Sequence, residues 1–268
     1  WNAFDADAQT VRIEIEVGPL NNTDLIRVVD DGNGMTRERA ELSFSRVGDS
    51  WKLAPGTSSE GGRLVHGKYG RGRYAAFSLG TAVQWSSTSQ AIAGGELSTI
   101  HVRGHRSTLD RFEIDAVTVE GDETGTVVDI RTVTPEADAA FDTTEPLRQR
   151  LLMEFALHLE RHKDFKIEFL GTPINPSAAV SSRTPIVLEM PDGVAGNATL
   201  TVIEWKLSNV ERRLYLCSSG GAILDEMQPG VQAVGAEFTA YLEWDGFTRD
   251  QSLLLEGDGD TPAGNVVQ

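Results

Sequence analysis

The sequence is poor in cysteine, in long apolar runs and in positive charge. One cysteine, Cys217, stands among 268 residues, so an internal disulfide is excluded, and the apolar run Leu214–Cys217 predicts that its side chain is buried. No apolar run approaches the roughly 18 residues that a membrane-spanning helix needs, so we expect no membrane partner. No signal peptide is visible, and together with the single cysteine this predicts a reducing, cytoplasmic setting.

Basic residues are outnumbered, with 24 Lys and Arg against 40 Asp and Glu and a net charge of −16 at pH 7. Such a surface repels a nucleic-acid backbone over most of its area, so we expect no strong nucleic-acid binding. Residues 37–73 depart from this trend, and we interpret their basic side chains as counter-charge for a phosphorylated ligand, the alternative being a solvated face. These side chains are Arg37, Arg39, Arg46, Lys52, Arg63, Lys68, Arg71 and Arg73.

The stretch 66–80, HGKYGRGRYAAFSLG, contains a G-x-x-G-x-G pattern followed by a predicted short helix over 74–79 that ends at Gly80. A glycine-rich turn that leads into a helix presents unpaired backbone N–H groups and the positive end of the helix dipole, which suits a phosphate group. An ordinary glycine-rich loop is the alternative. The candidate phosphate-binding residues are Gly67, Lys68, Tyr69, Gly70, Arg71 and Gly72.

A second candidate site follows the apolar strand expected over 25–30, which ends in the sequence Asp-Asp-Gly-Asn-Gly-Met. The carboxylate of Asp30 can accept a hydrogen bond from an exocyclic amine, while a flat ring lies over the backbone of Gly32 and Gly34 and against Met35. A tight turn and a calcium loop are the alternatives. The EF-hand pattern fails because no glutamate stands at the required spacing.

Two further polar groups join these candidates. Asn2 and Asp5 share one face of a helix expected over 1–9, and an amide oxygen beside a carboxylate can hold Mg²⁺ next to a phosphate chain. Thr126 enters a strand expected over 126–133, where its hydroxyl can complete the hydrogen bonds around a base ring. The alternatives are an exposed polar helix face and an ordinary β-branched strand residue.

Elsewhere the pattern is mostly that of strands. Residues 54–62 form a long polar segment that we interpret as a lid over the glycine motif. A helix with an apolar stripe is expected from 144 to 159; its His158 lies four residues before His162, and we expect a solvated helix face there because no third metal ligand is evident. Strands are expected over 11–17, 25–30, 82–88, 97–102, 112–119, 126–133, 165–169, 186–190, 198–207, 213–217 and 237–244.

The pattern of predicted elements changes at residues 181–184, where longer strands with few helices begin. We therefore expect a first domain over 1–183, whose start lies before Trp1, and an incomplete, smaller β-rich domain over 184–268. No repeats or heptads appear in the sequence.

Four pieces stand in a fixed order: Asn2–Asp5, then 30–35, then 67–72, then Gly125-Thr126. This order resembles the GHKL ATPase superfamily, which includes gyrase B subunits, heat-shock chaperones, sensor histidine kinases, MutL and MORC proteins. The resemblance covers about residues 1–135 and is closest to the MORC-like or MutL-like branch. It implies an α+β fold: a Bergerat-type α/β sandwich with a mixed, largely antiparallel sheet and helices on one face, followed by a smaller β-rich α/β domain.

The resemblance also implies residue roles. Asn2 would ligate Mg²⁺, Asp5 would support that site, and Asp30 would accept the adenine amino group in a pocket that Thr126 completes. Gly32, Gly34 and Met35 would line the same pocket. Residues 67–72 would wrap the β- and γ-phosphates, with charge from Lys68. Ser50 and Lys52, in the sequence VGDSWK, are secondary candidates.

The function implied is Mg²⁺-dependent ATP binding and hydrolysis that drives lid closure and dimerisation of two copies of the chain. The glutamate that activates water in the hydrolysing members would fall four residues before Asn2, which is before Trp1. A non-hydrolysing, ATP-gated assembly module is the alternative. A histidine kinase is a further one, although none of the histidines has an obvious phosphoacceptor setting; they are His66, His101, His105, His158 and His162.

Overall fold

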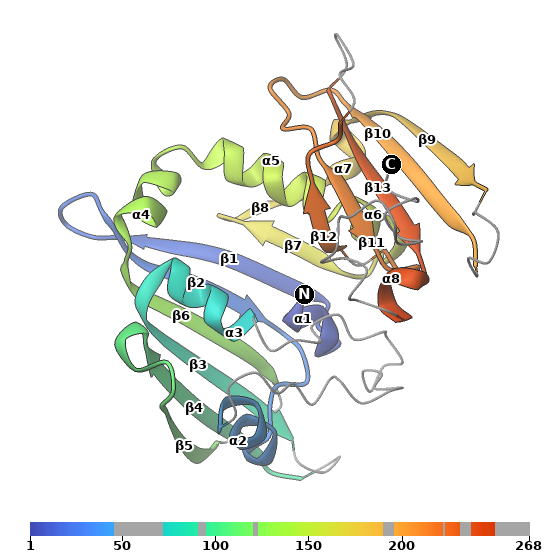
Figure 1. Cartoon of the computed structure of the whole chain (residues 1–268). Coiled ribbons are helices and arrows are strands. Elements are labelled where there is room, and N and C mark those ends of the chain that lie inside the picture. The colour runs from blue at the N-terminus through green and yellow to red at the C-terminus, as the bar shows by residue number, and fades with distance from the viewer. Residues whose placement is uncertain are drawn as a thin grey trace. The chain divides into compact units, whose positions relative to one another are not determined.

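The computed structural model describes residues 1–45, 72–90, 95–119, 123–189, 196–221, 223–230 and 237–249 (Figure 1). The chain divides into two compact units. The first comprises Trp1–Arg148 and Lys163–Ile174, and the second Gln149–His162 and Asn175–Gln268. The domain boundary at 183/184 stays a prediction. Among the described residues no helix is both long and apolar enough to cross a membrane.

The first unit is built on an eight-stranded sheet in the order β5-β4-β3-β6-β2-β1-β7-β8. The pair β1 and β7 is parallel, while the other neighbouring strands are antiparallel, which confirms the mixed, largely antiparallel sheet. The strands are β1 (Thr10–Val17), β2 (Thr23–Asp30), β3 (Gly80–Gln90), β4 (Leu97–His105), β5 (Phe112–Val119), β6 (Gly125–Val133), β7 (Lys166–Phe169) and β8 (Thr172–Pro173).

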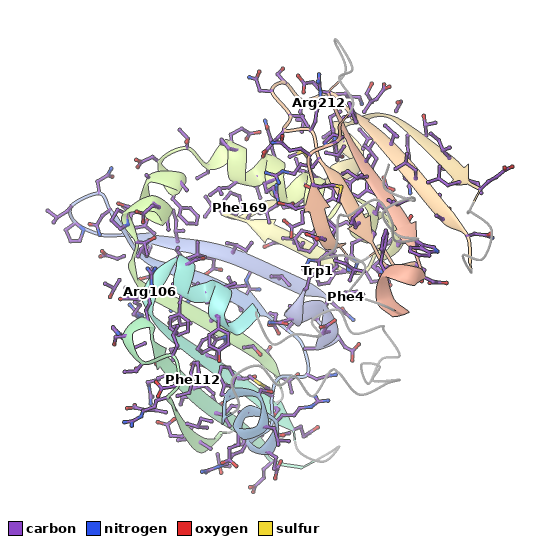
Figure 2. The ribbon with its side chains drawn as sticks, in the orientation of Figure 1. Trp1, Phe4, Arg106, Phe112, Phe169 and Arg212 are labelled. Carbon is purple, nitrogen blue, oxygen red and sulfur yellow. The ribbon has the colours of Figure 1, made fainter. Side chains whose placement is uncertain are left out.

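Helices cover one face of this sheet, as expected. Successive strand residues point to opposite faces, so the apolar residues of each alternating pattern gather on one side. There, α2 (Arg37–Ser45), the 3₁₀ turn η2 (Ala76–Ser78) and α4 (Pro135–Asp142) contribute to one apolar cluster with the sheet. Phe44 of α2 packs on Trp85 and on Phe112, with ring centroids 5.0 Å apart in both pairs. Phe112 is the first residue of β5 (Figure 2). This cluster is the core of the first unit.

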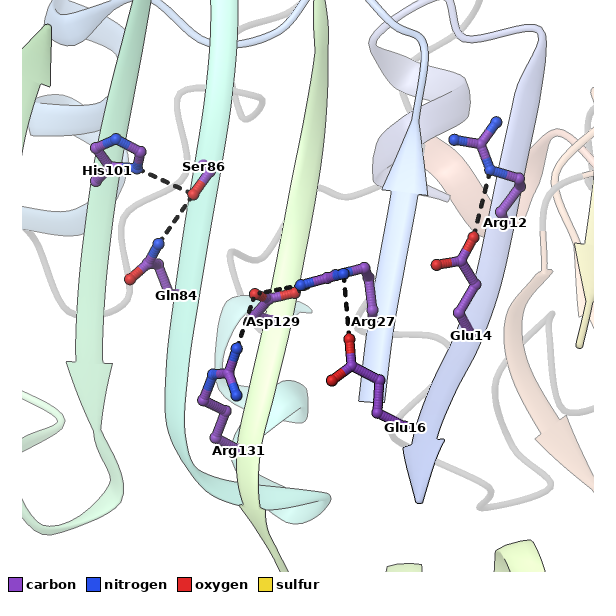
Figure 3. Close-up of polar contacts among 9 residues, drawn as sticks. All are labelled: Arg12, Glu14, Glu16, Arg27, Gln84, Ser86, His101, Asp129 and Arg131. Atoms are coloured by element: carbon purple, nitrogen blue, oxygen red, sulfur yellow. Dashed lines mark hydrogen bonds and ion pairs between the residues drawn. The ribbon is translucent and has the colours of Figure 1, made fainter. Parts of the chain in front are cut away.

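The opposite face of the sheet carries charged and polar side chains (Figure 3). Arg27 on β2 binds Asp129 on β6 through two hydrogen bonds of 2.7 and 3.0 Å. On the neighbouring strands β3 and β4, Oγ of Ser86 lies 3.0 Å from Nδ1 of His101. This face owes its character to the charged half of the alternating pattern in β1, β2 and β6.

Several helices differ from the expectation. The first, α1 (Asn2–Asp5), is short because Asp7 adopts a left-handed backbone with φ of 61°, which turns the chain toward β1. Helix α3 (Gly72–Ala75) continues as η2, and Gly80 already begins β3. The helix expected over 144–159 is interrupted at Phe155, which separates α5 (Thr144–Glu154) from α6 (Ala156–Arg161).

The second unit holds a five-stranded sheet in the order β12-β11-β13-β10-β9, which confirms a smaller β-rich α/β part. Met153 and Leu157 share its main core with Tyr215 and Tyr241, whose rings stack with centroids 5.1 Å apart. Its elements are α6, α7 (Pro176–Ala179), α8 (Gly246–Arg249), the C-terminal part of α5, β9 (Val180–Leu188), β10 (Ala198–Trp205), β11 (Leu214–Cys217), β12 (Ile223–Met227) and β13 (Phe238–Trp244).

The sequence predicted the burial or exposure of two side chains of this unit. Cys217 is fully buried, as predicted. The expectation of a solvated helix face at His158 is wrong, because His158 is only 1% exposed; its ring lies 4.6 Å from that of His162. No group of three metal-ligating side chains occurs in the described part of the chain.

Candidate functional site

A row of three polar side chains crosses the helix-covered face of the first sheet. Asp30, the last residue of β2, is paired with Thr126 on β6, and Thr126 is paired with Ser87 on β3. Residues paired across strands point to the same face, so a carboxylate and two hydroxyls lie side by side. Three segments that are distant in the sequence therefore form one site.

The Asp30 carboxylate is half-buried, and its Oδ1 accepts the N–H of Gly32 at 3.0 Å. Burial raises the pKa of Asp30 because water that would solvate the charge is excluded, while hydrogen bonds from the backbone of Gly32 and Thr126 act in the opposite direction. A partly desolvated carboxylate of this kind gains from an added N–H donor. The site therefore suits a ligand with an exposed amino group.

Two glycines allow the backbone to pass close to this row. Gly34 has a φ of +68°, and a Cβ there would lie 2.0 Å from the carbonyl oxygen of Thr88. Gly125 has a φ of +151°, and a Cβ there would lie 2.3 Å from the carbonyl oxygen of Asp30. Any side chain at either position would displace a neighbouring strand. Gly34, which was predicted to line a base pocket, thus also brings the loop close to β3, and Gly125 brings β6 close to the end of β2.

The loop after Asp30 is tied to the end of α1. The N–H of Asn33 donates to the carbonyl of Ala6 at 2.7 Å, and its side chain donates to Asp7 at 3.2 Å. Asp31 accepts the N–H groups of Gln9 and of Thr10, the first residue of β1, at 2.7 and 2.8 Å. These contacts fix α1 and the loop to each other.

The predicted metal-site residues lie on α1. Asn2 is exposed and Asp5 half-buried. Phe4 between them (Figure 2) is 2% exposed, and its ring packs edge-on against Phe165 with centroids 5.4 Å apart. The buried ring anchors the short helix. The amide oxygen of Asn2 and the carboxylate of Asp5 are hard oxygen donors of the kind that Mg²⁺ takes together with water and phosphate oxygens. The residues present therefore fit the metal.

Ser87 was not predicted from the sequence as a residue of this site. This side chain is fully buried; its Oγ accepts the N–H of Met35 at 2.9 Å and lies 2.9 Å from Oγ1 of Thr126. One signal was present in the sequence. Val83, Trp85 and Ser87 occupy successive core-facing positions of β3, so a hydroxyl stands where the alternation calls for an apolar residue.

The structure brings together Asp30, Gly32, Gly34, Met35 and Thr126. Of the phosphate-binding candidates, Gly72 is the first residue of α3. The remaining candidates lie outside the described residues; they are Ser50, Lys52, Gly67, Lys68, Tyr69, Gly70 and Arg71.

The proposed basic counter-charge is described only in part. Arg37 pairs with Glu41 one turn later on α2, at 2.8 Å. Arg39 also lies on this helix, and its backbone N–H donates to the Thr36 side chain at 3.3 Å, so that Thr36 caps the helix. A role of these arginines toward phosphate stays a prediction.

Comparison with known proteins adds three findings. Residues 1–126 match the family model described as histidine kinase-, DNA gyrase B- and HSP90-like ATPase. Over 45 residues the chain is 49% identical to the DNA mismatch repair protein MutL of Halalkalibacterium halodurans and 51% identical to that of Solibacter usitatus. The aligned stretch is 17% of this chain and spans only 7% and 6% of those relatives.

The third finding concerns a solved structure. The fold resembles the ATPase region of Saccharomyces cerevisiae topoisomerase II with a TM-score of 0.50 over 90% of this chain and 71% of that one. The sequence identity is 8%, so this likeness shows the fold alone. It confirms the α+β architecture expected from the sequence.

Proposed function

We propose that this chain binds and hydrolyses ATP, on the premise that its residues 1–126 belong to the histidine kinase-, DNA gyrase B- and HSP90-like ATPases, the GHKL superfamily. The observation that carries the proposal is the paired row of Asp30 and Thr126 beside the loop of Gly34. Such a row offers a hydrogen-bond acceptor and a hydroxyl at the edge of an apolar core.

Adenine recognition is assigned to the described residues. The exocyclic amino group donates to the Asp30 carboxylate, which replaces solvation lost through burial. Thr126 completes the set at a ring nitrogen, directly or through a water molecule. Gly32 and Gly34 line the pocket with backbone that packs closely against Ala6 and Thr88. Met35, half-buried beside the core cluster, supplies an apolar surface for the flat ring.

Phosphate and metal binding are assigned to α1 and the glycine motif. Asn2 would hold Mg²⁺ with support from Asp5, and the backbone N–H groups of 67–72 would surround the β- and γ-phosphates together with Lys68. Ser50 and Lys52 are secondary phosphate contacts. Mg²⁺ bound in this way neutralises charge on the phosphate oxygens.

Hydrolysis needs a general base, which we assign to a glutamate before Trp1. We assign lid closure to residues 54–62, and dimerisation of two copies of the chain to the ATP-bound state. These finer steps rest on the family alone. They make the chain the switch module of a larger protein.

The experiment is a calorimetric titration of ATP into this chain with and without Mg²⁺, followed by phosphate release from a version extended at the N-terminus. We expect binding that strengthens with Mg²⁺, and turnover in the extended protein alone. Binding without turnover in either protein would favour the non-hydrolysing assembly module. Absence of ATP binding by both proteins would contradict the proposal.

A further inference from the structure

We propose that Ser87 makes the site selective for adenine over guanine by fixing the direction of the Thr126 hydroxyl, an inference that rests on the proposed ATP-binding function. Ser87 is a positioning residue: it acts on the ligand through Thr126. The three side chains that carry the inference are Ser87, Thr126 and Asp30, which stand side by side on β3, β6 and β2.

The first step concerns the proton of Ser87. Its Oγ already accepts a hydrogen bond from the N–H of Met35 at 2.9 Å. The side chain is fully buried, and a buried hydroxyl that does not donate its proton forfeits about 1–3 kcal/mol. Oγ1 of Thr126, 2.9 Å away, is the acceptor that the described side chains offer. Ser87 therefore donates to Thr126.

The second step concerns Thr126. A hydroxyl has one proton and two acceptor positions. When Oγ1 accepts the hydrogen bond from Ser87, the proton of Thr126 takes no part in the Ser87–Thr126 contact. The Thr126 hydroxyl then directs this proton toward the ligand. The half-buried Thr126 then presents a donor beside the acceptor carboxylate of Asp30.

The third step is complementarity with the base. Adenine carries an exocyclic amino donor next to an unprotonated ring nitrogen, so its edge matches an acceptor at Asp30 and a donor at Thr126. Guanine carries a carbonyl oxygen next to a protonated ring nitrogen, which is the reverse pattern. A buried site that meets the wrong pattern leaves polar groups unpaired, and one reversed hydrogen bond is worth about tenfold in affinity.

Two roles of Ser87 are separable by measurement. Loss of the contact to the Met35 N–H loosens the loop, which weakens ATP and GTP binding alike. Loss of the contact to Thr126 frees that hydroxyl to rotate, which reduces the preference for ATP. The ratio of the two dissociation constants therefore reports the proposed role, and a merely structural role leaves the ratio unchanged.

The experiment measures dissociation constants of ATP and GTP by calorimetry for the wild-type chain, Ser87→Ala, Thr126→Val and the double variant. We expect Ser87→Ala to lower the ATP preference by about tenfold, and to have no further effect on it when Thr126→Val is already present. Ser89→Ala is the matched control, since Ser89 is also buried on the same face of β3, two residues along. Its preference should equal that of the wild type.

Ser87→Cys keeps the volume but donates weakly, so it decides the question if Ser87→Ala fails to fold; we expect the same loss of preference. An unchanged ratio in Ser87→Ala or Ser87→Cys, or additive effects in the double variant, would overturn the inference while ATP binding by the wild type upholds the proposed function. Wild-type protein that binds neither nucleotide would overturn both.

Discussion

Gly125 and Asp30 meet so closely that a Cβ on Gly125 would lie 2.3 Å from the carbonyl oxygen of Asp30. The next residue, Thr126, is the register partner of Asp30. Gly125 and Thr126 therefore have different structural roles. The glycine permits β6 to approach the end of β2, and the threonine places a hydroxyl beside the carboxylate.

Gly34→Ala should destabilise the protein and weaken ATP binding strongly, because its φ is +68° and the new Cβ would lie 2.0 Å from the carbonyl oxygen of Thr88. Gly171→Ala is the matched control: its φ is +72°, but nothing lies within 4 Å of the added atom. We expect Gly171→Ala to cost the backbone strain alone, about 1–2 kcal/mol. Denaturant unfolding of both variants checks this, and equal losses would contradict the steric argument.

The ligand-free protein should gain stability from Asp30→Asn at neutral pH. Burial raises the pKa of Asp30 above its ordinary value of 3.8, so the folded state binds the proton more tightly than the unfolded chain. The contribution of Asp30 to the wild-type free energy of unfolding is therefore fully present below the ordinary pKa of 3.8. It falls as the pH rises through the raised pKa of the folded state. The gain in free energy of unfolding should shrink as pH approaches 4. A gain in the free energy of unfolding that does not change with pH would contradict a raised pKa of Asp30.

The two stacked tyrosines of the second unit should respond oppositely to loss of their hydroxyls. Tyr241 donates to the carbonyl of Met153 and accepts from Thr239, so Tyr241→Phe should cost about 1–2 kcal/mol. Tyr215 is fully buried; its hydroxyl has no hydrogen-bond partner in the described part of the chain, and burial raises its pKa to about 12. Tyr215→Phe should be neutral or stabilising. Thermal unfolding compares them, and equal losses would contradict the assignment.

The ion pair of Arg27 with Asp129 should contribute measurably to stability. It is bidentate, and the Asp129 side chain is 16% exposed, so a double-mutant cycle should give a coupling of about 1 kcal/mol. The pair of Arg103 with Asp115 on the same face is the control. Both partners there are about half exposed to water, so we expect almost no coupling. Comparable couplings in the two cycles would show that burial of the pair is unimportant.

The elements with regular local patterns were predictable from the sequence. The period-two alternation in 11–17 predicted β1, and Thr36 before an acidic first turn is a local signal of the same kind for the start of α2. Helix α4 was not predicted, although Thr134 accepts the N–H of Ala137 as its cap and Pro135 is its first residue. The predicted helix began later, at residue 144. Local signals therefore identified many elements but did not separate adjacent ones.

The candidate site was predictable where one segment carries it, and the family resemblance added Thr126 from a distant segment. The sequence 30–35 showed a carboxylate and glycines together, but the contact of Ser87 with Thr126 depends on the register of β3 against β6. Register is set by packing of whole strands, and a short polar residue in a strand gives no local sign of its partner. For this reason the role of the Ser87 hydroxyl, which contacts the Met35 N–H in the loop and Thr126 in the sheet, was recognised only in the structure.

The most direct test is a calorimetric titration of ATP with Mg²⁺ into the wild-type chain, Asp30→Asn and Asp31→Asn. Asp31 is the matched control, since its exposed side chain accepts the N–H groups of Gln9 and Thr10, which an asparagine oxygen can also do. We expect ATP binding to be lost in Asp30→Asn and kept in Asp31→Asn. Unchanged ATP affinity in Asp30→Asn would contradict the assignment of the adenine site.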